Sequence, residues 1–231
     1  MAKGLSGMGL PLIATPIVAG LFGPRPAVVI MSIPILVSNS LLLVTGWRGF
    51  PPILRDAGPM IATGVVGTIV GVQLLAYLDQ RVFALIISGL VLLFLLRGDR
   101  LLGEDPNARR VRVAGPLIGL IGGLLQGSTS ISSPLVGSYF HARRVSPADF
   151  VVVLAALFQI NSMVQIATLS ITGLYTETLF AFGLLSLVPS LLGLIAGIEL
   201  RGRVSAATFR RIISVLLVLS IANLLWRTFG G

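Results

Sequence analysis

The chain has 231 residues, of which 55% are hydrophobic and only 11% charged, and its formal net charge is +9. A soluble domain is typically about 45–50% apolar and about 25% charged, so this composition excludes an ordinary globular protein and predicts an all-α polytopic membrane protein. The basic charge does not indicate nucleic-acid binding, because the arginines lie in short loops between apolar segments. The absence of cysteine excludes disulfides and Fe–S clusters.

Apolar segments long enough to enter a bilayer recur along the whole chain. We expect them at about residues 8–22, 26–45, 59–78, 82–96, 113–140, 150–169, 178–200 and 208–227. Between the fourth and the fifth lies RGDRLLGEDPNARRVR (97–112), whose five arginines predict a cytoplasmic linker. This basic linker divides one integral membrane domain into two parts, 1–96 and 113–231.

The two parts resemble each other as repeats. KGLSGMGLPL (3–12) aligns with QGSTSISSPL (126–135), which pairs Lys3 with Gln126. PAVVIMSIPILVSNS (26–40) aligns with PADFVVVLAALFQINS (147–162), and both stretches end in Asn-Ser. The shared order predicts a duplication, with a first repeat at 1–96 and a second at 113–231. Thirteen residues, 113–125, precede the second motif but only two precede Lys3, so we expect a further N-terminal arm upstream of Met1.

Positive charge indicates which segments cross the membrane. If all eight segments span it, the 17 Lys and Arg residues divide 9 to 8 between the two sides. If the segments with KGLSGMGLP and QGSTSISSP instead enter and return on their own side, the division is 13 to 4, which the positive-inside rule favours. Each repeat is then a re-entrant, broken helix hairpin followed by about three transmembrane helices. The odd number of crossings makes the repeats inverted, as in secondary transporters whose site lies where the breaks meet.

The two polar motifs predict a site for a small anion. Non-helical backbone at membrane depth is tolerated only when it is buried in protein or lines a wet cavity. Glycine permits close approach of the backbone, and proline suits the first turn of a half-helix, whose free N–H groups favour an anion. The alternative is that these small residues only pack helices together. The candidate ligands in the motifs are Lys3, Gly4, Ser6, Gly7, Gly9, Pro11, Gln126, Gly127, Ser128, Thr129, Ser130, Ser132 and Pro134.

Further polar residues lie inside the apolar spans. Asn39 and Asn161 occupy equivalent positions in the two repeats, and both interhelical hydrogen bonding and a shared cavity explain them. Gln73, Gln159 and Gln165 are weaker candidates. No carboxylate lies at the centre of a span, so a proton relay has no evident carrier and a cationic substrate has no evident counter-ion.

The motif KGLSGMGLPLIATP, followed by Pro26-Ala27 and Ser38-Asn39, resembles the sulfite exporter TauE/SafE family of anion permeases, and the resemblance covers nearly the whole chain. Ser6 replaces a threonine of one branch of that family, and STSISS (128–133) replaces a glycine-rich run of many members. The resemblance implies a multi-pass protein of the cytoplasmic membrane that transports, commonly exports, sulfite, sulfonates or related small anions without a cofactor. The resemblance implies a functional role for the residues in the matching motifs, namely Gly4, Gly7, Gly9, Pro11, Asn39, Gly127, Ser130, Ser132, Pro134 and Asn161.

Three other functions compete with transport. An anion channel would use the same polar motifs, and a non-transporting assembly subunit would need none of them. An intramembrane hydrolase would need a base beside a serine, but the only histidine is His141, in the basic loop sequence HARRVSPAD. We therefore expect no enzyme and no metal site, with a small anion and membrane lipid as partners. The sequence does not indicate an oligomeric state.

Overall fold

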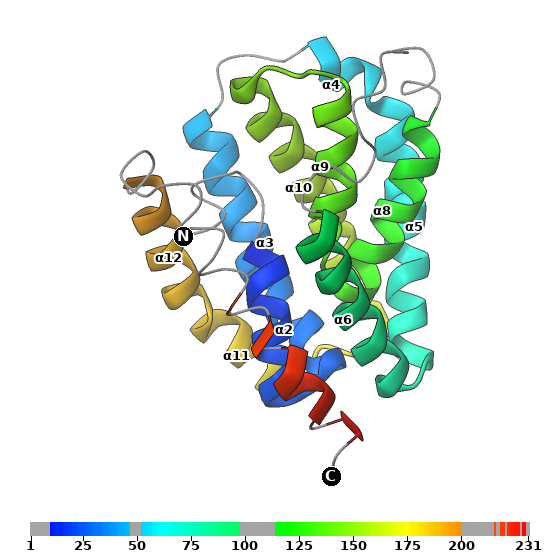
Figure 1. The fold of residues 1–231 in the computed structure, drawn as a ribbon, viewed down its shortest axis with the longest axis vertical. Helices are drawn as coiled ribbons and strands as arrows, with labels where there is room; N and C mark the ends of the chain where they lie inside the picture. The colour runs from blue at the N-terminus through cyan, green and yellow to red at the C-terminus, as the bar shows by residue number, and fades with distance from the viewer. Residues whose placement is uncertain are drawn as a thin grey trace.

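The computed structural model describes residues 10–46, 52–97 and 114–199, together with 215, 218–219, 221–226 and 228–229. The predicted ligands Lys3, Gly4, Ser6, Gly7 and Gly9 lie outside these ranges, as does nearly all of the 97–112 linker. All named elements in the described part are helices (Figure 1): α2 (Leu10–Phe22), α3 (Pro24–Gly46), α4 (Pro52–Asp56), α5 (Gly58–Tyr77), α6 (Gln80–Arg97), α8 (Gly115–Thr129), α9 (Ser133–Ala142), α10 (Pro147–Ile171), α11 (Glu177–Leu185) and α12 (Leu187–Glu199).

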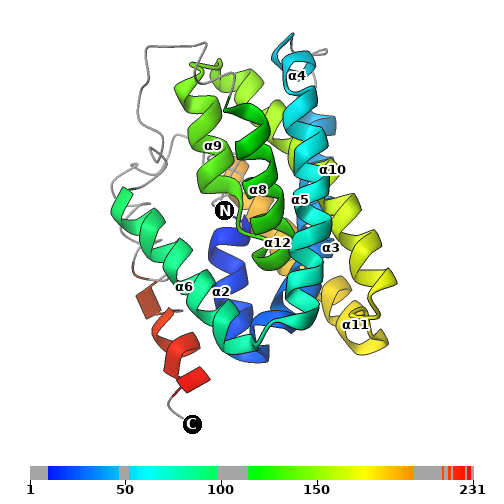
Figure 2. The same cartoon turned by 90° about the vertical axis from the view of Figure 1, so that its right-hand side faces the viewer.

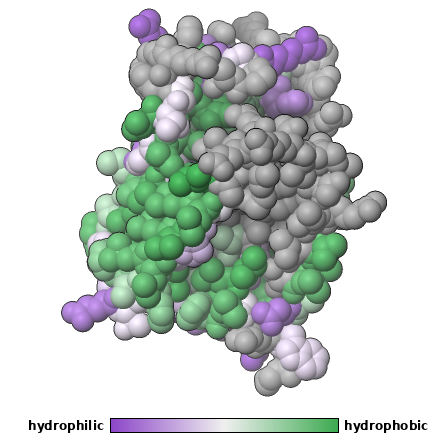
Figure 3. Space-filling view, turned by 90° about the vertical axis from the view of Figure 1, so that its left-hand side faces the viewer, coloured by the Kyte–Doolittle hydropathy of each residue, from purple (hydrophilic) through white to green (hydrophobic). Residues whose placement is uncertain are grey.

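Four stretches within the described residues are long and apolar enough to cross a membrane: Pro24–Gly46, Gly58–Tyr77, Asp149–Ile171 and Glu177–Ile195. The last of these is the least covered by the rest of the protein, with 11% of its window buried. Figure 3 views the molecule from the side on which α11 and α12 lie, and the described surface there is mostly apolar. An apolar outer face is what a lipid-embedded helix requires, so the prediction of an all-helical, polytopic membrane protein is confirmed at this level.

The helix break expected within residues 126–134 is present, and it separates α8 from α9. Gly115 of α8 lies against Tyr139 of α9, and Gly122 lies against Val136, so the two helices are antiparallel. At the open end of this hairpin Arg143 pairs with Asp56 of α4 at 3.3 Å. The hairpin therefore enters the helix bundle and returns to the side on which it began, and Figure 2 shows α8 and α9 adjacent at the end of the molecule that carries α4.

Close backbone contact between α5 and α8 holds this hairpin in place. Six glycines form the interface: Gly64, Gly67 and Gly71 of α5, and Gly119, Gly123 and Gly127 of α8. At Gly67, Gly71, Gly119, Gly123 and Gly127 a Cβ atom would come within 3.0 Å of a backbone atom of the facing helix. Thr63 Oγ1 adds an interhelical bond to the Pro116 carbonyl oxygen at 2.7 Å. Small residues allow membrane helices to approach this closely, and here they align α8 beside α5 in parallel.

The start of α3 is bonded to the end of α5 that lies away from α4. Arg25, near the start of α3, donates from Nε to the Leu75 carbonyl oxygen and from Nη2 to the Leu78 carbonyl oxygen, both at 2.9 Å. A cation at the last carbonyls of α5 satisfies acceptors that the helix itself leaves free. The short connection from α2 to α3 therefore lies at the C-terminal end of α5, whereas α9 ends near its N-terminal end.

The apolar segment expected at 178–200 contains one membrane-length stretch, Glu177–Ile195, with a one-residue interruption at Ser186 between α11 and α12. α11 ends at Leu185 and α12 begins at Leu187, with Ser186 between them donating from Oγ to the Gly183 carbonyl oxygen at 2.7 Å. Pro189 follows in the first turn of α12, where it has no N–H to offer the Leu185 carbonyl oxygen. Proline thus explains a break that hydropathy alone does not reveal.

Candidate functional site

The candidate site is built around residues 130–132, where α8 ends and α9 begins. Ser130 adopts a left-handed conformation, with φ of 59° and ψ of 9°, and its N–H bonds to the Gln126 carbonyl oxygen at 2.9 Å. The Ile131 N–H bonds to Thr129 Oγ1 at 3.1 Å. A left-handed serine costs about 1–2 kcal/mol, so neighbouring contacts must stabilise this turn.

Gln165 of α10 supplies those contacts. Its Nε2 atom donates to the Gln126 carbonyl oxygen at 2.9 Å and to Ser130 Oγ at 3.1 Å. Its Oε1 atom accepts from Gln126 Nε2 at 3.3 Å, and Ser132 Oγ donates to Gln126 Oε1 at 2.7 Å. These four side chains, which we call the Gln165 cluster (Gln126, Ser130, Ser132 and Gln165), are at most 2% exposed. They form a neutral, hydrogen-bonded clamp on the helix break.

The hydroxyl groups of the motif differ in what they can still donate. Ser128 Oγ donates to the Leu124 carbonyl oxygen at 2.7 Å, and Thr129 Oγ1 donates to the Leu125 carbonyl oxygen at 2.8 Å. The hydroxyl hydrogen of Ser132 is directed to Gln126. Ser130 accepts from Gln165, which leaves its own hydrogen for a further acceptor. Of these four predicted hydroxyl ligands, Ser130 is the one that the structure leaves free to donate.

The start of α9 adds backbone donors to this hydroxyl. Ser132 is the N-cap residue, but its side chain makes no capping bond. Pro134 lies within the first two helical positions and has no N–H, so the first-turn donors of α9 are the N–H groups of Ser133 and Leu135. Ser133 and Pro134 are buried. Uncapped, buried N–H groups at a helix N-terminus attract a negative charge without a formal cation.

Asn161 lies one helical turn before Gln165 on α10 and is 6% exposed. A Cβ at Gly64 of α5 would lie 3.3 Å from Asn161 Oδ1, which places this amide beside the glycine interface. Asn161 Oδ1 and the neighbouring Ser162 Oγ are buried and have no hydrogen-bond partner among the described residues. Buried polar atoms are normally satisfied, so a ligand or water is expected against these two.

Asn39 is fully buried on α3, which packs beside α10. Gln159 Nε2 of α10 donates to Ser40 Oγ at 3.0 Å, so the two helices cross next to both asparagines. Asn39 and Asn161 therefore lie at similar depth on neighbouring helices. The weaker candidate Gln159 serves here as an interhelical bond.

The start of α2 approaches the helix break from the other side. Leu12 of α2 and Ile131 of the break belong to one buried apolar cluster. Pro11 is buried in the first turn of the described part of α2, and the fully buried Thr15 Oγ1 has no partner among the described residues. Figures 1 and 2 both place the start of α2 next to the junction of α8 and α9.

The structure also places three residues that the sequence analysis discussed: Gly127, Gln165 and His141. Gly127 faces α5, because a Cβ there would overlap the Thr68 backbone. Gln165 was only a weaker candidate in the sequence analysis; its spacing of four residues from Asn161, which places both on one helix face, is a signal by which it could have been found. His141 is exposed in the last turn of α9, about 12 Å along the helix from Ser133. The described residues contain no cluster of metal-ligating side chains.

Comparison with known proteins identifies one family. The model of the family described as Sulfite exporter TauE/SafE matches residues 1–224, almost the entire chain. No curated protein and no solved structure matches the chain.

Proposed function

The chain belongs to the sulfite exporter TauE/SafE family, a family of membrane anion permeases, and on that basis we propose that it exports sulfite or a small organosulfonate across the cytoplasmic membrane. In this proposal the anion binds at mid-membrane, at the start of α9 and at the equivalent motif before α2. The observation that carries the proposal is the buried, uncapped start of α9, held in position by Gln165.

The chemistry of the helix break between α8 and α9 suits an anion that must also leave. The Ser130 hydroxyl and the N–H groups of Ser133 and Leu135 are hydrogen-bond donors without formal charge. They replace part of the hydration shell that the anion loses, since burial of a charge without such partners is prohibitive. A neutral donor set also avoids a tight ion pair, which favours release on the other side. Lys3, outside the described residues, is proposed as an additional attraction.

The directions of the helices support an inverted repeat of 1–96 and 113–231. α2 ends near the C-terminal end of α5, where Arg25 binds, and α9 ends near its N-terminal end, where Arg143 meets Asp56. The following helices are also antiparallel, because Leu42 of α3 clusters with Ala155 of α10, and Val29 with Leu169. Two half-helices that start near each other and run in opposite directions are typical of the substrate site of secondary transporters.

Transport is tested by counterflow in proteoliposomes. Vesicles loaded with unlabelled sulfite would take up labelled sulfite or methanesulfonate through the wild-type protein. Ser130→Ala and Asn161→Ala are expected to abolish most of this uptake while the variants elute as folded protein. Ser186→Ala is the matched control, because its hydroxyl also lies at a helix break, but between α11 and α12.

The outcomes separate the competing functions. Loss of counterflow in Ser130→Ala and Asn161→Ala but not in Ser186→Ala supports an anion site at the break. Anion flux without counterflow would indicate a channel, because a pore does not exchange substrate through an alternating site. Undiminished counterflow in both site variants would refute the proposed binding residues, and absence of any flux would favour an assembly subunit.

A further inference from the structure

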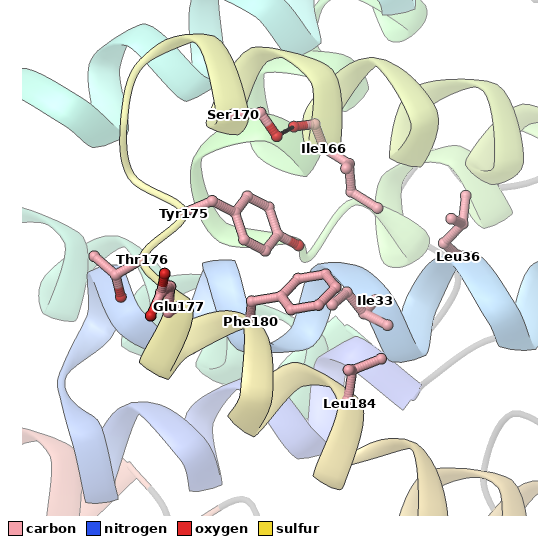
Figure 4. A pocket seen from close by; sticks show the side chains of 9 residues that line it. All are labelled: Ile33, Leu36, Ile166, Ser170, Tyr175, Thr176, Glu177, Phe180 and Leu184. Carbon is pink, nitrogen blue, oxygen red and sulfur yellow. Dashed lines mark hydrogen bonds between the residues drawn. The ribbon is translucent and has the colours of Figure 1, made fainter.

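A cavity away from the helix break opens between α3, α10 and α11 (Figure 4). We call it the outer groove, and its volume is about 530 Å³, within the range of small-molecule sites. Its walls come from three helices and from the connection between α10 and α11. Ile33 of α3 and Ile166 and Ser170 of α10 form two of these walls.

The groove is polar at one end and apolar at the other. Tyr175, Thr176 and Glu177 form the polar mouth, and Leu36, Ile166 and Leu184 form the apolar end. Leu184 follows Glu177 by seven residues in α11, which places it about 10 Å further along the helix axis. One leaflet of a bilayer core is about 15 Å thick, so the length of the groove is roughly two thirds of the thickness of a leaflet.

Hydrogen bonds and a ring contact hold the residues of the polar mouth in position. Tyr175 bonds through its hydroxyl to Ser32 of α3, and its ring lies against Phe180 with centroids 6.2 Å apart. Thr176 Oγ1 accepts from the Leu179 N–H at 3.3 Å and so caps α11. Glu177 is left exposed in the first turn of α11, with no ion pair to another described residue.

The negative charge of Glu177 determines which class of molecule the outer groove can bind. The Glu177 carboxylate repels an anion, so the outer groove is not an entry route for the proposed substrate. It attracts a cationic group that carries a long apolar chain. The bilayer has direct access to the groove, because Phe180 is 49% and Leu184 46% exposed on the apolar face.

We propose that the outer groove binds a phospholipid with an ethanolamine headgroup. Its primary ammonium would donate charge-assisted hydrogen bonds to the Glu177 carboxylate, with one acyl chain along Phe180 and Leu184. An acyl chain gains little on moving from bilayer to groove, since both are apolar. Selectivity among lipids therefore depends on the headgroup. A choline headgroup has no N–H to donate, and a phosphoglycerol headgroup adds no cation, so both bind more weakly.

Native mass spectrometry of the full-length protein in detergent tests this site. The protein would be exposed to equal amounts of phosphatidylethanolamine, phosphatidylcholine and phosphatidylglycerol with matched acyl chains. In wild type, the fraction of protein that retains the ethanolamine lipid is expected to be at least about threefold higher than the fraction that retains either other lipid. An exposed ion pair is strong enough for a preference of this size. Glu177→Gln removes that preference. Asp79→Asn, a carboxylate between α5 and α6, is the matched control and keeps it.

A second variant tests the cavity itself. Ser170→Phe fills the groove without changing charge, and it is expected to lower retention of all three lipids in a protein that melts at the wild-type temperature. Equal retention of the three lipids by wild type, or an unchanged preference in Glu177→Gln, would overturn the proposal. The readout is lipid retention rather than anion flux, so its failure leaves the proposed transport function unaffected.

Discussion

Replacement of Gly123 by alanine tests whether the α5–α8 glycine interface holds the α8–α9 hairpin in place. A Cβ at Gly123 would come within 3.0 Å of three backbone atoms of Gly64: its carbonyl oxygen, its carbonyl carbon and its Cα. Backbone cannot rotate away as a side chain can, so the two helices must separate by about 1.5 Å to restore an ordinary contact distance. Such overpacking costs about 1–3 kcal/mol.

Gly89→Ala is the matched control for this substitution. Gly89 lies in the interior of α6, and a Cβ there would meet nothing within 4 Å. Without a clash, the same replacement is expected to stabilise the helix by about 0.5–1 kcal/mol, because alanine loses less backbone freedom than glycine on folding. The two glycine variants should therefore shift the free energy of unfolding in opposite directions.

The assay is equilibrium unfolding of purified protein in mixed micelles titrated with dodecyl sulfate, followed by far-ultraviolet circular dichroism. Gly123→Ala should unfold at a lower dodecyl sulfate fraction than wild type, and Gly89→Ala at a higher one. If Gly123→Ala is as stable as wild type, or if both variants lose the same stability, backbone contact between α5 and α8 does not hold the hairpin.

Two further predictions concern the helix break and the outer groove. Gln165→Met keeps the side-chain length but removes three hydrogen bonds, so we expect a loss of about 1–3 kcal/mol in the same unfolding assay together with loss of counterflow; wild-type counterflow would show that the clamp is dispensable. Burial raises the pKa of Tyr175 above its usual value of 10.0, and this outweighs the lowering by its bond to Ser32. The neutral phenol therefore contributes stability that is full below about pH 10 and is lost as pH rises through the folded-state pKa. Absorbance titration of tyrosine should show a late-ionising group that is absent from Tyr175→Phe, and identical titrations would contradict the assignment.

Much of the architecture follows from composition and charge. Apolar runs without charge can be stable only as helices in lipid, so the positions of α3, α5, α10 and the α11–α12 segment were predictable. The bias of arginines predicted that QGSTSISSP does not complete a crossing. In the structure α8 and α9 form a hairpin there, with Arg143 and Asp56 paired at its open end.

Local sequence could not tell which polar side chains remain available. Ser128 and Ser130 are chemically identical and two residues apart, but Ser128 is inside α8 and donates to its own helix, whereas Ser130 is past the last helical turn. The difference arises because α8 ends between these two residues, at a point where Gln165 of a distant segment donates a hydrogen bond to Ser130 Oγ. Gly127 likewise appears in a polar motif, and only the packing of α8 against α5 shows that it serves close helix contact.

The sequence by itself determined that this protein is a multi-pass helical membrane protein with a polar break in its second half, because hydropathy, proline and charge bias are properties of single segments. The tertiary structure decided which donors face the break, which glycines are required for contact between helices, and where a groove opens to lipid. Those features depend on pairs of residues such as Gln165 and Ser130, which are 35 positions apart and meet only when α10 packs against the end of α8.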